Sequence, residues 1–185
     1  IVWFEGYCVM SNLRLLNETN VSTAVSQVEI DDVFSSSYNA YVIKSSDVMV
    51  STYSRLNLRL RDISGTTSTE NYTYALNNTA VTGSTGSLYG SSSTSFVNAL
   101  GYGLADSGNN SQGSTIHVFN PFQSSFTYFI TESASNGSNL YNNTGGCVHR
   151  VANSYTGITI VPIVISGSNP TLNQGTVKIY GYRLD

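Results

Sequence analysis

The segment at residues 54–63, SRLNLRLRDI, constrains the fold more than any other part of the chain. Its leucines recur at every second position, which is the side-chain period of a β-strand and not that of a helix. We therefore predict a strand with one apolar face in the core and one polar face in solvent. The apolar face consists of Leu56, Leu58 and Leu60, and the polar face of Arg55, Asn57, Arg59 and Arg61. The run Ser64-Gly65-Thr66-Thr67 that follows predicts a turn.

Short runs with strand character recur along the rest of the chain, while good helix formers are sparse relative to Ser, Thr, Val, Ile and Tyr. We predict an all-β protein, a single jelly-roll-like antiparallel β-sandwich of about 8–10 strands. Its last two strands, at residues 157–165 and 175–184, are expected to be adjacent, and Val177 and Ile179 should join the leucines in the core. Long polar stretches at residues 82–94, 106–113 and 133–146 are predicted to be loops.

Composition excludes two classes of partner. The chain has 8 Lys+Arg against 11 Asp+Glu, a net charge of −3, and no basic cluster, so nucleic acid is not an expected partner. Its longest apolar run, at residues 157–165, is far shorter than the roughly 20 residues of a membrane-spanning helix, so no membrane insertion is expected.

Few residues have the spacing of a catalytic or metal site. His117 and His149 lie in alternating stretches without a nearby ligand, and we expect them to be ordinary strand residues. The acidic cluster Glu29, Asp31 and Asp32 lacks the spacing of a calcium loop. No serine lies in a nucleophile motif. We therefore predict a protein that is not an enzyme and that binds no cofactor.

The two cysteines, Cys8 and Cys147, leave open a single disulfide that would close most of the chain. The first residues, IVWFEGYCVM, lack the cationic start and cleavage site of a secretory signal. A reducing compartment is therefore expected, and it favours two separate thiols over the disulfide.

Two apolar segments point to assembly with other subunits. Residues 157–165, GITIVPIVI, are apolar on both faces, and Pro162 places this strand at a sheet edge or at a bulge. The N-terminal segment is also rich in large apolar side chains. Such surfaces aggregate unless other chains cover them. We predict a homo-oligomer with contacts from residues 1–16 and 157–184, specifically Trp3, Phe4, Tyr7, Ile158, Ile160, Val161, Ile163, Tyr180 and Tyr182.

Three motifs in a fixed order resemble a recurrent β-sandwich domain of tailed-bacteriophage virion proteins. The first is SSSYNAYVIKSSDVMVSTYSRLNLRL at residues 35–60, followed by Arg61-Asp62-Ile63-Ser64-Gly65 and Asn71-Tyr72-Thr73-Tyr74. The second is IHVFNP at residues 116–121, and the third is the apolar run at 157–165 with Gly175-Thr176-Val177-Lys178-Ile179-Tyr180-Gly181. Cys147-Val148-His149-Arg150 departs from the Gly-rich segment of that domain.

The resemblance covers roughly residues 27–185 and divides the chain into a sandwich domain there and an N-terminal contact arm at residues 1–26. It implies a non-enzymatic structural component of a virion, on a tail fibre, tail tip or capsid surface, assembled in the host cytoplasm. By analogy it implies a trimer, with other virion proteins as partners and a host-surface glycan as a candidate receptor. The alternatives are a monomeric carbohydrate-binding module, which presents aromatic residues to a sugar, and a glycan-cleaving virion protein with paired carboxylates.

Overall fold

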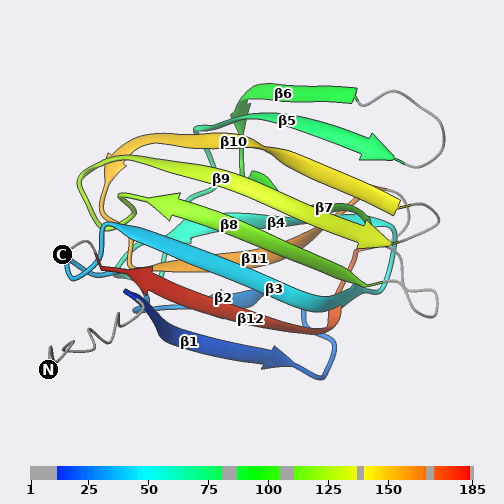
Figure 1. The fold of residues 1–185 in the computed structure, drawn as a ribbon, viewed down its shortest axis with the longest axis horizontal. Coiled ribbons are helices and arrows are strands. Elements are labelled where there is room, and N and C mark those ends of the chain that lie inside the picture. The colour runs from blue at the N-terminus through cyan, green and yellow to red at the C-terminus, as the bar shows by residue number, and fades with distance from the viewer. Residues whose placement is uncertain (1–11, 81–86, 105–110, 137–139, 166–168, 184–185) are drawn as a thin grey trace, which may run out of the picture.

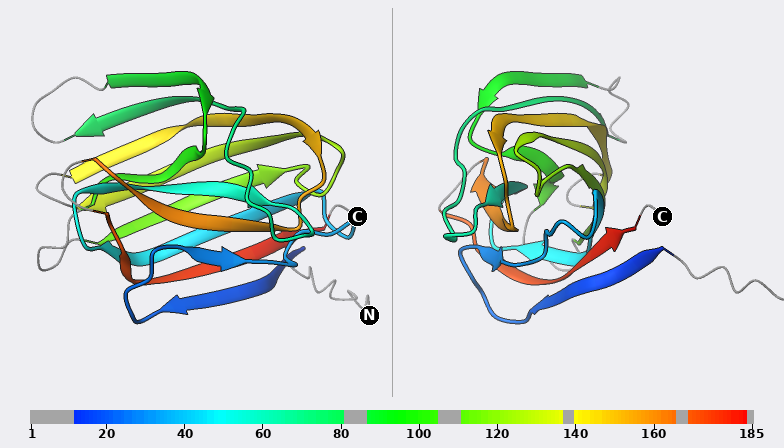
Figure 2. Two further views of the ribbon diagram at one scale, coloured as in Figure 1. Left: turned by 180° about the vertical axis from the view of Figure 1, so that it is seen from behind. Right: turned by 90° about the vertical axis from the view of Figure 1, so that its left-hand side faces the viewer.

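The computed structural model describes residues 12–80, 87–104, 111–136, 140–165 and 169–183, and these form two packed antiparallel sheets. The strands are β1 (Leu13–Val21), β2 (Val28–Ile30), β3 (Ala40–Val50), β4 (Ser54–Arg61), β5 (Tyr72–Ala80), β6 (Ser87–Thr94), β7 (Val97–Leu104), β8 (Gln112–Phe119), β9 (Ser125–Asn136), β10 (Leu140–Asn153), β11 (Gly157–Val164) and β12 (Leu172–Tyr182). Figure 1 looks onto the larger sheet, in the order β1-β12-β3-β8-β9-β10-β5-β6. The smaller sheet, β2-β11-β4-β7, lies behind it, as Figure 2 shows.

This architecture confirms the predicted all-β sandwich, in which the chain crosses repeatedly from one sheet to the other. Its twelve described strands exceed the expected number. The difference lies in polar stretches that we predicted to be loops: β6 falls within residues 82–94, and β9 and β10 extend through most of residues 133–146. These strands are rich in Ser, Thr, Asn and Gly, so they carry no apolar alternation, and their backbone pairing is invisible in the sequence pattern.

The prediction that the last two strands are adjacent is wrong. Strand β11 pairs with β2 and β4 in the smaller sheet, whereas β12 pairs with β1 and β3 in the larger one. The connection between β11 and β12 therefore carries the chain across the sandwich. Within the described residues, no helix has the length and hydropathy needed to cross a bilayer.

The core between the sheets contains the residues that alternation predicted. Leu56, Leu58 and Leu60 on β4 and Val177 and Ile179 on β12 are each at most 1% exposed. Strand β11 lies next to β4 in the smaller sheet. Its side chains face the same core, since Ile158 pairs with Leu60 and Ile160 with Leu58. Burying each large aliphatic side chain contributes about 1.5–3 kcal/mol, so these paired strands stabilise the centre of the sandwich.

The polar face of β4 is not the solvent face that we predicted. Asn57 is fully buried and Arg61 is 6% exposed, while Arg55 and Arg59 are half-buried. Part of the reason is that the chain folds back over this face: the Arg59 Nε–H donates a hydrogen bond to the backbone carbonyl of Ser95 at 2.9 Å. Neither side-chain amide atom of Asn57 has a hydrogen-bond partner in the described part of the chain.

The predicted N-terminal arm does not end at residue 26. Strand β1 is an edge strand of the larger sheet and pairs with β12 from Leu13 opposite Tyr182 to Val21 opposite Gly175. Val21 is buried in the core. Residues from 13 onward are therefore part of the sandwich. Trp3, Phe4, Tyr7 and Cys8 lie outside the described residues, so their predicted roles stay predictions.

Candidate functional site

The sequence suggested that strand β11 exposes apolar side chains on both faces, but one of these faces is buried within the single chain. Ile158 and Ile160 are fully buried within the single chain, so their assignment to a subunit contact is wrong. Val161 and Ile163 project from the other face of the strand and are half-buried. Pairing with β2 ends at Ile160, which leaves Pro162 with β4 as its described neighbour, consistent with the expected local edge.

The open apolar surface lies instead on the outer face of the larger sheet. The strand register aligns side chains from successive strands into two rows across this face. The first row consists of Leu13, Tyr182, Ala40, Phe119, Tyr128 and Val148. The second consists of Leu15, Tyr180, Val42, His117 and Ile130. Tyr182, Tyr128 and Ile130 are 42%, 48% and 51% exposed, so large apolar groups of these rows face solvent.

A groove of about 680 Å³ crosses the start of both rows. It forms because the register places small Ala40 between the rings of Tyr182 and Phe119. The rings of Phe119 and His117 lie nearly parallel on β8, at 15°. The groove is lined by Leu13, Asn39, Ala40, Tyr41, Val42, Lys44, Thr115, His117, Phe119, Asn120 and Tyr182. Predicted contact residue Tyr182 thus lines this groove, and Tyr180 lies in the adjoining row.

A charged row bounds this apolar surface. Lys178 on β12 stands opposite Lys44 on β3, which stands opposite Thr115 on β8. The ammonium group of Lys178 lies 3.3 Å from a carboxylate oxygen of Glu18, and both side chains are more than one-third exposed. The outer face of the larger sheet therefore has an aromatic half and a polar half.

Motif residues build the end of the sheet beside the groove. A Cβ atom at Gly181 would meet the ring of Tyr38, so the glycine allows this aromatic side chain to lie directly on β12. The hydroxyl of Tyr41 donates to the carbonyl of Ser35 and accepts from its N–H, both at 2.8 Å. Burial raises the pKa of Tyr41. The rings of Tyr41 and Phe34 meet edge to face, with centroids 4.6 Å apart.

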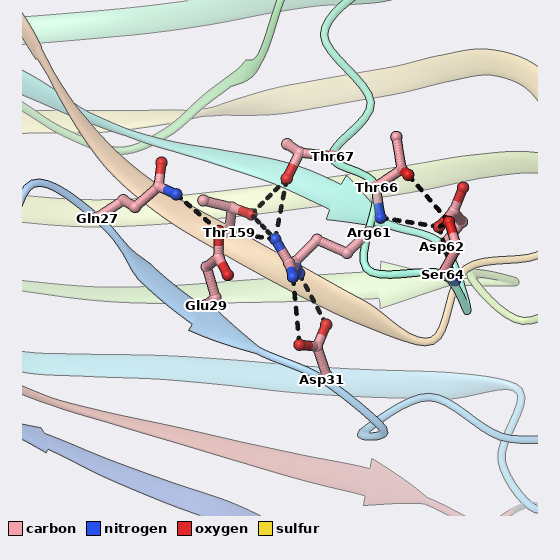
Figure 3. A network of polar contacts seen from close by, with 9 residues as sticks. All are labelled: Gln27, Glu29, Asp31, Arg61, Asp62, Ser64, Thr66, Thr67 and Thr159. Carbon is pink, nitrogen blue, oxygen red and sulfur yellow. Dashed lines mark hydrogen bonds and ion pairs between the residues drawn. The ribbon is translucent and has the colours of Figure 1, made fainter.

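The outer face of the smaller sheet is occupied by a polar network around Arg61 (Figure 3). The Arg61 Nε–H donates to Asp31 at 2.7 Å, and Nη1 lies 2.9 Å from Glu29. Nη1 also donates to the hydroxyls of Thr67 at 3.1 Å and Thr159 at 3.4 Å. The hydrogen bond to Asp31 raises the pKa of Arg61, with both carboxylates adding to the effect. Glu29 and Asp31, two members of the acidic cluster that lacks the spacing of a calcium loop, are thus paired with an arginine.

The turn predicted after β4 is present and is held by Asp62. Its carboxylate accepts hydrogen bonds from the backbone N–H groups of Ser64 and Thr66, each at 2.9 Å, and from the Ser64 hydroxyl. These bonds lower the pKa of Asp62. Gly65 adopts a left-handed φ of 77°, which suits a glycine at this position. The turn brings Thr67 back over β4 and into the Arg61 network.

The two histidines have different environments. His149 is fully buried, its Nε2 lies 2.9 Å from the Ser68 hydroxyl, and its ring packs against those of Tyr72 and Tyr155. Burial lowers the pKa of His149 to about 4. His117 is exposed on the outer face. The described residues contain no group of three His, Cys, Asp or Glu side chains placed to hold a metal ion.

Cys147 is a free thiol buried beneath the larger sheet. Burial raises its pKa to about 12, so the neutral form dominates at physiological pH and the thiol is a poor nucleophile. The question of a disulfide rests on Cys8, which is outside the described residues.

The fold and its surfaces define a β-sandwich that has an apolar groove on its broad sheet. No family model, curated protein or solved structure matches the chain. Tyr180 and Tyr182 were predicted from the sequence as contact residues, whereas the other residues of the two rows were not. Each row takes a single residue from each of several strands, so no contiguous segment carries the pattern. A clue was available in the outward positions of residues 115–119 and 126–130, where apolar side chains occur on both faces.

Proposed function

We propose that this chain is a non-catalytic structural subunit of a bacteriophage virion, located on a tail fibre, tail tip or capsid surface, and that it assembles into a homo-oligomer through its larger sheet. One observation carries the proposal: the outer face of that sheet holds two rows of mostly apolar side chains, of which Leu15, Tyr128, Ile130 and Tyr182 are 42–51% exposed. A face of this kind marks an interaction surface in a β-sandwich.

The packing of the phage-like motifs supports the virion assignment. The first and third motifs meet where Tyr38 lies against Gly181. The IHVFNP motif falls largely on β8, which pairs with β3 beside them. Motifs that are weak individually thus form one packing unit, as expected if they are the signature of a domain rather than three chance matches.

The groove chemistry supports a binding role over a catalytic one. Its described lining residues include no carboxylic acid, cysteine or serine, so the paired carboxylates of a glycan-cleaving enzyme are not found there. A carbohydrate-binding module is the second candidate. It is favoured by the rings of Phe119 and Tyr182 flanking Ala40 and by the polar residues Asn39 and Asn120 in the groove lining.

Light scattering coupled to size-exclusion chromatography tests the assembly. The expected mass is a multiple of the 19.9 kDa of one chain, three times that value for the trimer that we favour. Mass spectrometry of purified phage particles whose genome encodes the chain should then detect it as a stoichiometric component. A stable monomer that binds sugars would overturn the proposal in favour of the carbohydrate-binding module. Depolymerisation of a polysaccharide by the purified protein would overturn the non-catalytic assignment.

A further inference from the structure

The groove on the larger sheet has a simple chemical requirement for its occupant. Its lining is mostly apolar, and Lys44 is the one Lys, Arg, Asp or Glu side chain among the described residues that line it. A suitable occupant is therefore an extended, largely apolar segment with aromatic side chains and one negative charge.

The N-terminal residues 1–11, IVWFEGYCVMS, have this composition. Eight of the eleven are apolar or aromatic, and Glu5 is the one charged side chain among them. They also join the sheet at the groove, because Leu13, the first residue of β1, is part of its lining. Eleven extended residues span about 36 Å, against about 14 Å for the three strand spacings between β1 and β8. The segment is therefore long enough to cross the whole groove.

The direction of the chain at this point favours the groove of another subunit. The carbonyl of Asn12 accepts a hydrogen bond from the N–H of Arg183 at 3.1 Å, so strand pairing continues through residue 12. To enter the groove of its own subunit, the segment would have to reverse direction immediately before residue 12, because residue 12 is still hydrogen-bonded to Arg183 at the end of the sheet. A neighbouring subunit can receive the segment without that reversal.

We propose that residues 1–11 of one subunit bind in the groove of a neighbouring subunit, with Trp3 and Phe4 among the apolar side chains and Glu5 close to Lys44. This inference rests on the proposed assembly and specifies the two surfaces that make it. A single segment reaching into the next copy also gives a head-to-tail contact, which closes into a ring when the rotation between copies allows it.

Trp3 is the chain's single tryptophan, so fluorescence excited at wavelengths that the 13 tyrosines do not absorb reports on this segment alone. As the protein concentration rises, the Trp3 emission should shift to the blue and acrylamide quenching should fall several-fold. Both changes should follow the oligomer mass measured by light scattering. Tyr182→Ser removes a ring from the groove and should move the transition to about tenfold higher concentration.

Leu88→Ser is the control, because Leu88 is an exposed apolar residue on β6, at the other edge of the same sheet, and belongs neither to the two rows nor to the groove lining. It should leave the Trp3 transition unchanged. Protection of Trp3 in a protein whose light-scattering mass is that of a monomer places the segment in its own subunit's groove and overturns the inference. An oligomer with a quenchable Trp3 overturns it too, but leaves the proposed function standing. A monomer with an exposed Trp3 at every concentration overturns both.

Discussion

Removing the two carboxylates that face Arg61 should destabilise the protein more than removing Arg61 itself. The asymmetry follows from burial, since the Arg61 side chain is 7% exposed whereas those of Glu29 and Asp31 are 41% and 45% exposed. The carboxylates regain water when the arginine is replaced. The guanidinium stays buried when the carboxylates are replaced.

The expected magnitudes differ accordingly. The double variant Glu29→Gln/Asp31→Asn leaves a buried cation without an anion, and such losses destabilise by about 3–5 kcal/mol. The single variant Arg61→Met keeps most of the aliphatic packing and loses two ion pairs to half-exposed partners, worth about 0–1 kcal/mol each. Thr67 and Thr159 remain hydrogen-bonded to each other, with their hydroxyl oxygens 3.0 Å apart. We therefore expect Arg61→Met to lose about 1–2 kcal/mol.

Urea denaturation of the three proteins measures the difference. In a domain of this size, each kcal/mol corresponds to about 2–4 °C in melting temperature, so thermal unfolding gives an independent check. Glu18→Gln serves as a control, because its partner Lys178 is 39% exposed and the pair should contribute less than about 1 kcal/mol. If Arg61→Met proves less stable than the double carboxylate variant, the burial argument is refuted.

Three further predictions concern the core. Gly157→Ala should lower the free energy of unfolding by about 1–3 kcal/mol, as measured by urea denaturation, because the added Cβ meets the backbone of β2. Gly146→Ala is the control, since a Cβ there makes only ordinary contacts and should be close to neutral. Burial lowers the pKa of His149 from 6.5 to about 4, so the unfolded chain takes up a proton first and stability should fall as the pH drops through this range. Urea midpoints at pH 7 and pH 5 should differ less in His149→Gln than in the unmodified protein, and equal differences would contradict this assignment. In a Cys8→Ser background, Cys147 should resist alkylation at pH 8 until urea unfolds the chain, since burial raises its pKa to about 12. Rapid labelling of the folded protein would contradict this prediction by showing that the thiol is accessible.

Alternation in the sequence was sufficient to predict one side of β4 and insufficient for the other. The buried positions of Leu56, Leu58 and Leu60 follow from the local requirement that one face be apolar. Whether Asn57 and Arg61 meet water depends on what lies over the opposite face, and that is decided by residues distant in the chain. Asp31 comes from thirty positions earlier and Thr159 from almost a hundred positions later.

The candidate binding surface was harder to predict than the core for a related reason. Tyr182 and Phe119 are separated by more than sixty residues in sequence, yet the register places a single small residue, Ala40, between them. Such a row depends on strand order and on register, and a shift of one residue in either pairing would turn the side chains to the opposite face. Composition reveals an excess of aromatic residues but does not say which of them share a surface.

The two sheets have different outer faces, and this difference favours the larger one as the surface for the assembly that we propose. On the smaller sheet, the centre of the outer face is closed within the chain, because the turn after β4 brings Thr67 over Thr159 and the carboxylates of Glu29 and Asp31 neutralise Arg61. On the larger sheet, large apolar side chains remain exposed beside a groove. The inward face of β11, with Ile158 and Ile160, is buried within one subunit, while Val161 and Ile163 on its outward face are half-buried. We therefore expect a partner chain to contact β12, β3 and β8, where Tyr182 is 42% exposed and lines the groove.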